Sequence, residues 1–423
     1  MTTAVSARRA LSFGTAFAVA ALLPTAAQAT DGYFLNGVGA KAKGAGGVEI
    51  AMPQDTLVIA VNPAAATEIG HRLDIGVDLF VPDRGARIAG NGAGLDGSYS
   101  GNGANPFVLP EVAYVRPLSD HLAVGLAISG NGGMNTHYDT NPFAGIGASG
   151  YAGVNLQQIQ ISPTVAYEFA PGQSIGVSPV LVLQSFSMNG AQPFSGYSQD
   201  PEHFTNNGTD WTTGFGVRVG YLGSIGSHVK IGAFYQSKVN SGRFEKYAGL
   251  FADSGDFDVP AAYGAGVSVR PVKALTLGVD YKRIEYSHVG AVGNSISALF
   301  AGAPFGSDNG PGFGWRDIDV WKFGAVYDLS EKLTLRAGYG HSENPVPASQ
   351  TLLNIFAPGV VRGHYTVGVS YKVNSGFELT AYAMRAPRQT VHGEGSIPSS
   401  FGGGEADVYL AETAVGLGFG FTL

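Results

Sequence analysis

Hydrophobic and polar residues alternate with a period of two along most of the chain after His71. In one clear example, Leu275, Leu277, Val279 and Tyr281 occupy one face of a strand, and Thr276, Gly278, Asp280 and Lys282 occupy the other. The segment from His364 to Lys372 repeats this pattern. Alternation over about ten residues is typical of a strand that crosses a membrane in a barrel. The same pattern also fits a half-buried strand of a soluble sandwich.

The connections between the alternating segments favour the barrel. About fourteen strands are expected, an even number typical of outer-membrane barrels. They fall near 71–88, 106–116, 121–133, 153–169, 173–190, 211–222, 228–245, 258–270, 274–288, 316–328, 332–342, 361–373, 376–391 and 408–423. Short turns, such as 170–172 and 330–331, alternate with long loops rich in Gly, Asn and Asp. Short turns on one side and long loops on the other are typical of outer-membrane barrels, so both ends of the wall are expected on the periplasmic side.

Three proline residues interrupt predicted strands. Pro110, Pro163 and Pro179 each lack a backbone N–H, so a closed wall can hold them only at bulges or breaks. The predicted third strand also runs into Gly130-Asn131-Gly132-Gly133. Such a run predicts a kink or a gap, although an ordinary Gly-rich strand end leading into a loop is the alternative.

The start of the chain predicts export. Arg8 and Arg9 precede an apolar stretch, and Ala27-Gln28-Ala29 is an A-x-A cleavage site, so residues 1–29 are interpreted as a signal peptide. No later run of about 20 apolar residues could form a membrane-spanning helix. A membrane protein without such helices must be a closed β-barrel, here expected over 71–423.

Residues 30–70 break the pattern of the wall, and we call this segment the hatch. It is rich in Gly and Ala, lacks sustained alternation and ends near Asn62-Pro63-Ala64. Irregular backbone at membrane depth is tolerated only inside protein, so the hatch is expected to plug the barrel lumen. Asn62, Pro63 and Ala64 are expected to fix the turn from the hatch to the first strand.

Composition supports a membrane location and excludes several functions. Charged residues make up 13% of the chain, against about 25% in a typical soluble domain. Removing Arg8 and Arg9 takes the formal net charge from −7 to −9, which disfavours nucleic acid as a partner. The chain has no Cys, and its nine His are scattered, so no metal or other cofactor is predicted. No catalytic motif is present, and an enzyme is not predicted; a hydrolase assembled across strands is the one enzymatic alternative.

Several motifs resemble the FadL family of outer-membrane transporters for long-chain fatty acids and other hydrophobic compounds. They are Phe34-Leu35-Asn36 and Asn62-Pro63-Ala64 in the hatch, Leu109 to Tyr114, Val259 to Tyr263, Trp321 to Tyr327, Leu333 to Tyr339, and Asn344 to Gln350. The last strand also resembles the C-terminal insertion signal of outer-membrane proteins, although Leu423 replaces the usual terminal aromatic residue. The resemblance implies a monomeric barrel in the outer membrane that takes up hydrophobic molecules by diffusion, with lateral exit at a kinked third strand.

Three groups of residues are candidates for this transport. The apolar hatch residues Phe34, Leu35, Val38, Ile50, Leu57 and Ile59 are expected to line a substrate pocket, and Gly130, Gly132 and Gly133 the lateral opening. Because a buried carboxylate needs a cation, lumen-facing basic residues are candidate partners of a fatty acid: Lys282, Lys322, Arg336 and Arg362, with His364 as a possible donor. Pairing with wall carboxylates such as Asp280, Asp328 and Glu378 is the alternative role of these cations.

The cargo and the role of the loops stay open from sequence alone. The chain has no convincing counterpart, near Gln184 to Phe186, of a basic residue that the family uses for the carboxylate, so aromatic or aliphatic hydrocarbons are an alternative cargo. The long loops carry apolar residues that suggest ligand contact: Phe194, Tyr197, Phe204, Tyr247, Leu250, Phe251, Leu299, Phe300, Phe305 and Phe313. A non-transporting structural or adhesive barrel is the other alternative.

Overall fold

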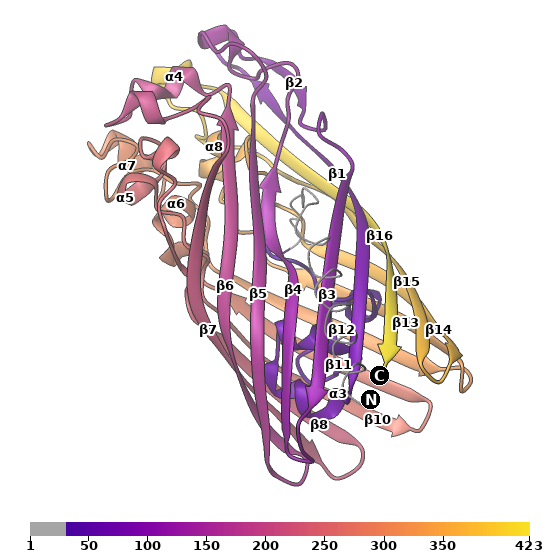
Figure 1. Ribbon diagram of the computed structural model, residues 1–423. Coiled ribbons are helices and arrows are strands. Elements are labelled where there is room, and N and C mark those ends of the chain that lie inside the picture. Colours follow the sequence, from indigo (N-terminus) through magenta and orange to yellow (C-terminus); the bar gives the residue numbers. More distant parts are fainter. Residues whose placement is uncertain (1–30) are drawn as a thin grey trace, which may run out of the picture.

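The computed structural model describes residues 31–423, and the predicted signal peptide at 1–29 lies outside this range. Within the described residues, fourteen long strands form one closed antiparallel wall (Figure 1). These strands are β1 (Arg72–Ala89), β3 (Phe107–Pro117), β4 (Leu122–Asn135), β5 (Gly153–Ala170), β6 (Gln173–Asn189), β7 (Asp210–Ile225), β8 (Val229–Gln236), β10 (Ala262–Val272), β11 (Leu275–Ile284), β12 (Ile318–Asp328), β13 (Leu333–Ser342), β14 (Gly363–Asn374), β15 (Phe377–Val391) and β16 (Glu405–Thr422). The wall closes where β16 pairs with β1, which confirms the predicted barrel.

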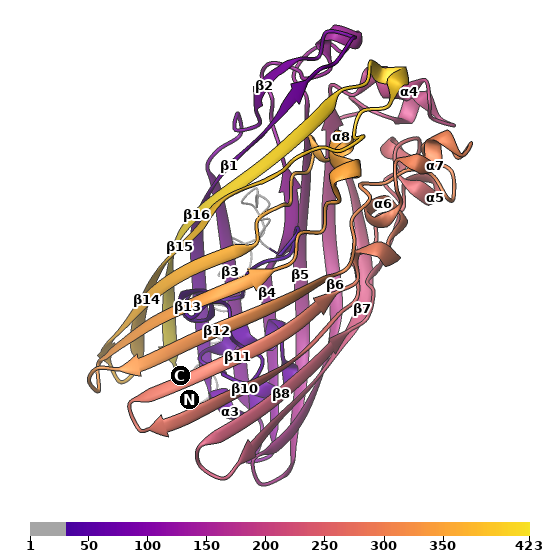
Figure 2. The ribbon, with the colours of Figure 1, turned by 180° about the vertical axis from the view of Figure 1, so that it is seen from behind.

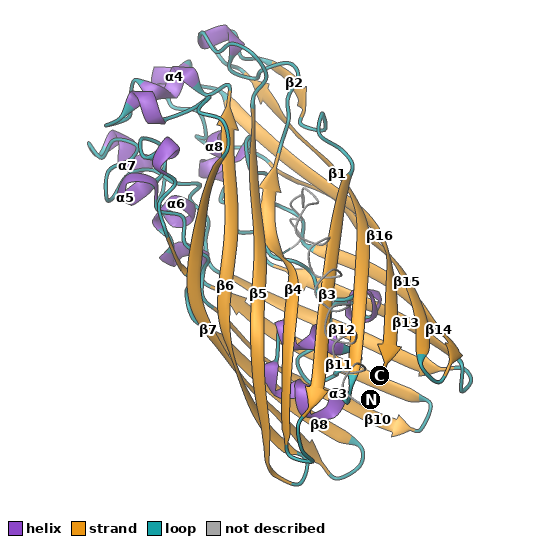
Figure 3. Ribbon diagram, viewed as in Figure 1, coloured by secondary structure: helices purple, strands orange, loops and turns teal. Residues whose placement is uncertain are grey.

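The connections alternate in length as expected. Tight turns join β3 to β4, β5 to β6, β7 to β8, β10 to β11, β12 to β13 and β14 to β15, at the end of the barrel where β16 finishes. The long loops gather at the opposite end (Figure 2). Figure 3 shows that most helices lie in these loops and in the lumen. The loop helices are η4 (Ala144–Ile146), α4 (Gln192–Ser195), η5 (Pro201–His203), η6 (Glu245–Tyr247), α5 (Ala252–Gly255), η7 (Tyr286–His288), α6 (Gly290–Gly293), α7 (Ser297–Phe300), η8 (Ala348–Gln350), α8 (Thr351–Asn354) and η9 (Ser399–Phe401).

Two short strands lie outside the regular wall. Strand β2 (Gly97–Ser100) pairs with the upper part of β1, and β9 (Asn240–Ser241) pairs with β7. The predicted strand 228–245 is therefore too long, because β8 ends at Gln236. Its ladder with β7 changes there, where the backbone N–H of Val217 donates to the Ser237 hydroxyl.

The wall has polar residues inside and apolar residues outside. On β1, Asp74 and Asp78 are buried. The residues that follow them, Ile75 and Leu79, face outward and are each about two-fifths exposed. The opposite arrangement would suit a soluble protein, whereas an apolar outer face suits a barrel surrounded by lipid. Among residues 31–423, no helix has the length and apolar character needed to cross a membrane.

The prolines lie at breaks in the ladders, as predicted. Strands β5 and β6 pair at Ile161 with Leu181 and again at Val165 with Val177, but the residues between them are unpaired. Pro163 and Pro179 fall in that break. Since neither proline has an N–H to donate, the ladder loses bonds there without leaving donors unsatisfied.

The hatch lies inside the barrel, where Figures 1 and 2 both show its indigo ribbon. It contains α2 (Ala40–Gly44), η2 (Thr56–Ala60), η3 (Pro63–Ala65) and α3 (Ala66–Ile69). Its backbone passes so near the wall that a Cβ on Gly338 would lie 2.2 Å from the Gly46 nitrogen. Glycine on both sides therefore permits this close approach.

Candidate functional site: a lumenal cavity beside a gap in the wall

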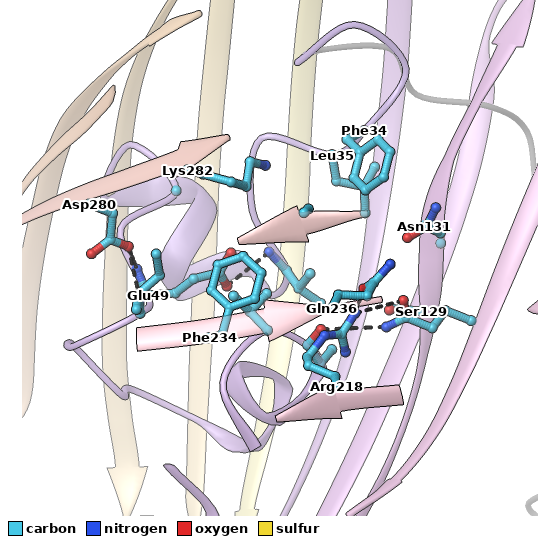
Figure 4. Close-up of a pocket in the computed structure, with 18 of the residues that line it drawn as sticks. Phe34, Leu35, Glu49, Ser129, Asn131, Arg218, Phe234, Gln236, Asp280 and Lys282 are labelled. Atoms are coloured by element: carbon cyan, nitrogen blue, oxygen red, sulfur yellow. Dashed lines mark hydrogen bonds between the residues drawn. The ribbon is translucent and has the colours of Figure 1, made fainter. Parts of the chain in front are cut away.

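A cavity lies between the hatch and the wall, and six of the predicted binding residues meet in it. Phe34, Leu35, Val38 and Ile50 contribute from the hatch, with Lys282 from β11 and Lys322 from β12. Figure 4 shows this cavity. Its other lining residues are Gly47, Glu49, Ala60, Val61, Ser129, Gly130, Asn131, Gln160, Arg218, Phe234, Gln236, Ala262 and Asp280.

The remaining candidates lie elsewhere. Leu57 and Ile59 do not line the cavity; they are buried with Val58, Ala113 and Val115 in an apolar cluster that reaches the cavity at Val38 and Ala60. Their side chains are accounted for by packing of the hatch against β3 and its neighbours.

The other predicted cations are also outside the cavity. Arg336 donates to Gln54 Oε1 and to Ser370 Oγ, each at 2.7 Å, on the short-turn side of the hatch. Arg362 is exposed. His364 is fully buried, with its Nε2 3.5 Å from a carboxylate oxygen of Glu412.

The predicted hinge residues hold the end of the hatch in a defined turn. The Asn62 amide donates to the carbonyl oxygens of Ile50 and Tyr221, at 2.8 and 2.9 Å, and its Oδ1 accepts from the Ala64 N–H. Asn62 thus acts as the N-cap of η3, with Pro63 at the first position of that helix. The contact with Tyr221 ties the hatch to β7.

The two lysines of the cavity already have an anionic partner in the hatch. Asp31 accepts from Lys282 at 2.9 Å and lies 3.3 Å from Lys322. Asp31 belongs to the hatch and not to a spanning strand. Burial raises its pKa, but the two lysines outweigh burial and bring the pKa down to about 2. Asp31 therefore stays ionised and neutralises part of this positive charge.

Glu49, also in the hatch, has the opposite behaviour. Burial raises its pKa to about 8, and the partial compensation by Lys322 and the Val38 N–H does not offset this. At neutral pH Glu49 is therefore mostly protonated. The backbone next to it is fixed, because the N–H groups of Glu49 and Ile50 both donate to Asp280, at 2.7 and 2.8 Å.

Arg218 is a lining residue that sequence reasoning missed. It lies on β7, is 3% exposed, and its Nη2 donates to Gln160 and Gln236. Its Nε and Nη1 have no partner among the described residues. A signal was present: the inward positions of β7 include Gly214, Gly216 and Gly220, and Arg218 is the cation among them. The segment from Gln184 to Phe186, where the family resemblance placed a basic residue, contains no cation. The Gln184 amide there donates to the Phe257 carbonyl at 2.8 Å.

The cavity borders a gap between β3 and β4. These strands pair only from Val112–Ile128 to Pro117–Ala123. Beyond that point β3 continues along β1, and β4 continues along β5 with a bulge at Asn131. The predicted irregularity at Gly130 to Gly133 is therefore present. Pro110 lies in the part of β3 that pairs with β1 but has no partner on the β4 side.

The start of the hatch contacts β4 at this gap. Phe34 forms a β-bridge with Gly132, and the Gly133 N–H donates to the Tyr33 carbonyl at 3.0 Å. A Cβ on Gly132 would lie 1.8 Å from that carbonyl oxygen. Glycine at 132 is thus needed for the hatch to lie against the bulged strand.

A second, apolar cavity lies among the long loops. Six of the predicted loop residues line it: Phe194, Phe204, Leu250, Phe251, Phe305 and Phe313. Tyr197 and Phe300 remain exposed. Between this cavity and the lumen, Tyr33 of the hatch packs against Phe257, Tyr286 and Trp315, with ring centroids 5.2 to 6.3 Å apart. One aromatic layer therefore joins the loop cluster to the hatch.

Comparisons with known proteins agree with this architecture. The family model described as "Outer membrane protein transport protein (OMPP1/FadL/TodX)" matches residues 17–420. The chain belongs to this family. It is therefore an outer-membrane β-barrel of a family that transports hydrophobic compounds, as the resemblance implied. The characterised members are transport channels.

Individual relatives of this OMPP1/FadL/TodX protein are distant. Outer membrane protein P1 of Haemophilus influenzae is 24% identical over 378 residues, which cover 77% of this chain and 78% of the relative. A long-chain fatty acid transport protein of Escherichia coli is 23% identical over 345 residues, covering 69% and 73%. Among solved structures, a Pseudomonas aeruginosa FadL homologue superposes with a TM-score of 0.70 at 16% identity, covering 92% of this chain and 99% of the other. The P. putida toluene transporter TodX gives 0.68 at 18% identity with the same coverage, which shows the shared fold.

Proposed function

We propose that this family member takes up long-chain fatty acids through the lumen and releases them sideways into the membrane. The main support for this proposal is that Ser129, Gly130 and Asn131 line the lumenal cavity at the point where β4 separates from β3. A molecule in that cavity is therefore beside an unpaired stretch of wall, which is where an apolar molecule could pass to lipid without crossing a hydrogen-bonded ladder.

The proposed path leads through the loop cavity, the lumenal cavity and the gap beside β4. A hydrophobic molecule first contacts the apolar cavity of the loops, where Phe194, Phe251 and Phe313 are buried. It then passes the aromatic layer at Tyr33 and enters the lumenal cavity. Movement of the hatch start, Tyr33 to Leu35, opens the gap beside β4. Residues 1–29 are proposed to be the signal peptide, 30–70 the hatch and 71–423 the barrel, acting as a monomer without catalysis.

Neutral hydrocarbons are the second candidate cargo. The observation that favours them is that Lys282 and Lys322 share Asp31 as an anionic neighbour, at 2.9 and 3.3 Å, so part of their positive charge is already neutralised. Phe34, Leu35 and Phe234 provide an apolar surface for either cargo.

Uptake by whole cells tests the proposal. Cells that lack the protein should lose uptake of labelled fatty acid at low external concentration, and the gene in trans should restore it. Loss of toluene uptake alone would support the second cargo. Unchanged uptake of both compounds would contradict transport as the function.

A further inference from the structure

The lumenal cavity contains one cation without an anionic partner. Of the basic residues that line it, Lys282 and Lys322 pair with Asp31, while Arg218 contacts only the neutral amides of Gln160 and Gln236. An Arg guanidinium stays charged in proteins, and an unpaired buried charge costs several kcal/mol. Some anion is therefore needed to balance Arg218.

No residue of the described chain supplies that anion. Glu49 is the carboxyl group near enough to act on Arg218 when ionised. Because burial raises the pKa of Glu49 to about 8, this group is mostly protonated at neutral pH. Asp280 lines the same cavity, and its carboxylate accepts from the Glu49 and Ile50 N–H groups. Figure 4 places Asp280 and Lys282 toward one side of the cavity and Arg218 toward the other.

Other donors without partners line the same cavity. In the part of the chain that the structure describes, Arg218 Nε and Nη1, Gln236 Nε2 and Ser129 Oγ lack hydrogen-bond partners. All three residues are at most 3% exposed. A group of buried donors without acceptors calls for a ligand that only accepts hydrogen bonds, as an ionised carboxylate does with its two oxygens.

The rest of the lining limits what this ligand can be. Phe34, Leu35, Ile50 and Phe234 present apolar side chains, so the ligand also needs an apolar part. The group of donors without partners contains one guanidinium, that of Arg218, and one guanidinium balances one negative charge. The lining therefore suits a molecule with a single anionic head and an apolar tail.

We propose that Arg218, with Gln236 and Ser129, is the carboxylate anchor of the lumenal cavity, so that the cargo is an apolar monocarboxylic acid and not a neutral hydrocarbon. This inference rests on the proposed function and decides between its two cargoes. Ser129 precedes the β4 bulge, so the anchored head group lies next to the gap through which the tail would leave.

The test compares an acid and an alcohol with the same alkyl chain. Hexadecanoate and hexadecanol are titrated against the purified full-length barrel at neutral pH, by displacement of a fluorescent acyl probe. In the wild type, the acid should bind about tenfold or more tightly than the alcohol. Arg218→Gln should weaken hexadecanoate by about 10- to 100-fold, the range for a hydrogen bond to a charged group, and leave hexadecanol within about threefold. Arg336→Gln is the matched control, because Arg336 is also a lumenal arginine but lies outside this cavity, and both affinities should stay unchanged.

The outcomes separate the anchor from the transport proposal. Equal weakening of acid and alcohol in Arg218→Gln, or no change in either, would overturn the anchor and leave hydrophobic transport intact. If Arg218→Gln does not fold, so that its unboiled and boiled forms migrate alike on a detergent gel, the wild-type affinities are the test. Equal wild-type affinity for hexadecanoate and hexadecanol would then overturn the anchor. Binding of neither ligand by the wild type would contradict the proposed function itself.

Discussion

At the scale of single residues, Gly130 lines the lumenal cavity next to the gap beside β4. The nearest atom to a Cβ at this position would be Leu35 Cδ1 at 3.9 Å, which is ordinary contact. Gly130→Ala should therefore keep wild-type uptake, whereas the larger side chain of Gly130→Leu would extend toward Leu35 and fill the cavity. We expect at least about a tenfold loss of fatty acid uptake in Gly130→Leu, with both variants still heat-modifiable on detergent gels. Equal uptake by the two variants would show that cargo does not pass this residue.

Single residues also show where sequence reasoning ends. Phe34, Leu35, Val38 and Ile50 could be placed in a lumenal pocket because apolar side chains in a polar lumen need a contact. The pairing of Asp31 with lysines about 250 and 290 residues later depends on the closed barrel, and no local pattern encodes it. The importance of Arg218 depends on the neutral amides that β5 and β8 place beside it.

At the scale of elements, the α2 segment of the hatch is fastened by a buried charge cluster. Lys43 pairs with Asp78 of β1 and with Glu111 of β3, the latter at 2.9 Å, and all three side chains are at most about 5% exposed. Lys43→Met would leave two buried carboxylates without their cation, which costs about 3–5 kcal/mol. We expect a loosened hatch, detected as higher ion conductance in planar bilayers and faster proteolysis within residues 31–70.

Lys41→Met is the control for that experiment. Lys41 pairs with Glu378 at 2.9 Å, but Arg72 lies 3.6 Å from the same carboxylate and would continue to balance it. Its effect on conductance should therefore be clearly smaller than that of Lys43→Met. An equal effect of the two variants would contradict the role assigned to the cluster around Lys43.

Glu49 makes the docking of the hatch depend on pH. Its pKa is raised to about 8 in the folded protein, so between about pH 5 and pH 8 the docked state holds a proton that an exposed Glu49 would release. Stability of the docked hatch should fall as pH rises through this window. Asp31, with its lowered pKa, stays ionised throughout and adds no slope. Proteolysis of the hatch should therefore speed up from about pH 5 to pH 8 in the wild type and become flatter in Glu49→Gln; the same slope in both proteins would contradict this assignment.

The strands themselves were predictable because a period of two is a local property. The fourteen wall strands agree with their expected positions within a few residues, except where β8 ends early at Gln236. The pairing of strands was not predictable at the same level. The gap beside β4 exists because β3 follows β1 and not β4 beyond Val112, which is a relation between three strands.

At the scale of the whole molecule, the question is how much of the hatch must move during transport. Its middle is held by the Lys43 cluster and by the Asp280 contacts, whereas its start, at Tyr33 and Phe34, separates the loop cavity from the lumenal cavity. A Cβ on Gly418 of β16 would lie 3.1 Å from the Ala40 Cβ, close to the roughly 3.5–4.5 Å that a disulfide needs. Because the chain contains no Cys, Ala40→Cys combined with Gly418→Cys creates the only thiol pair of the protein. We expect this tether to leave fatty acid uptake unchanged whether it is oxidised or reduced, since only the hatch start needs to shift. Loss of uptake on oxidation, restored by a reductant, would instead show that the whole hatch leaves the barrel, and the single-variant proteins control for effects of either substitution alone.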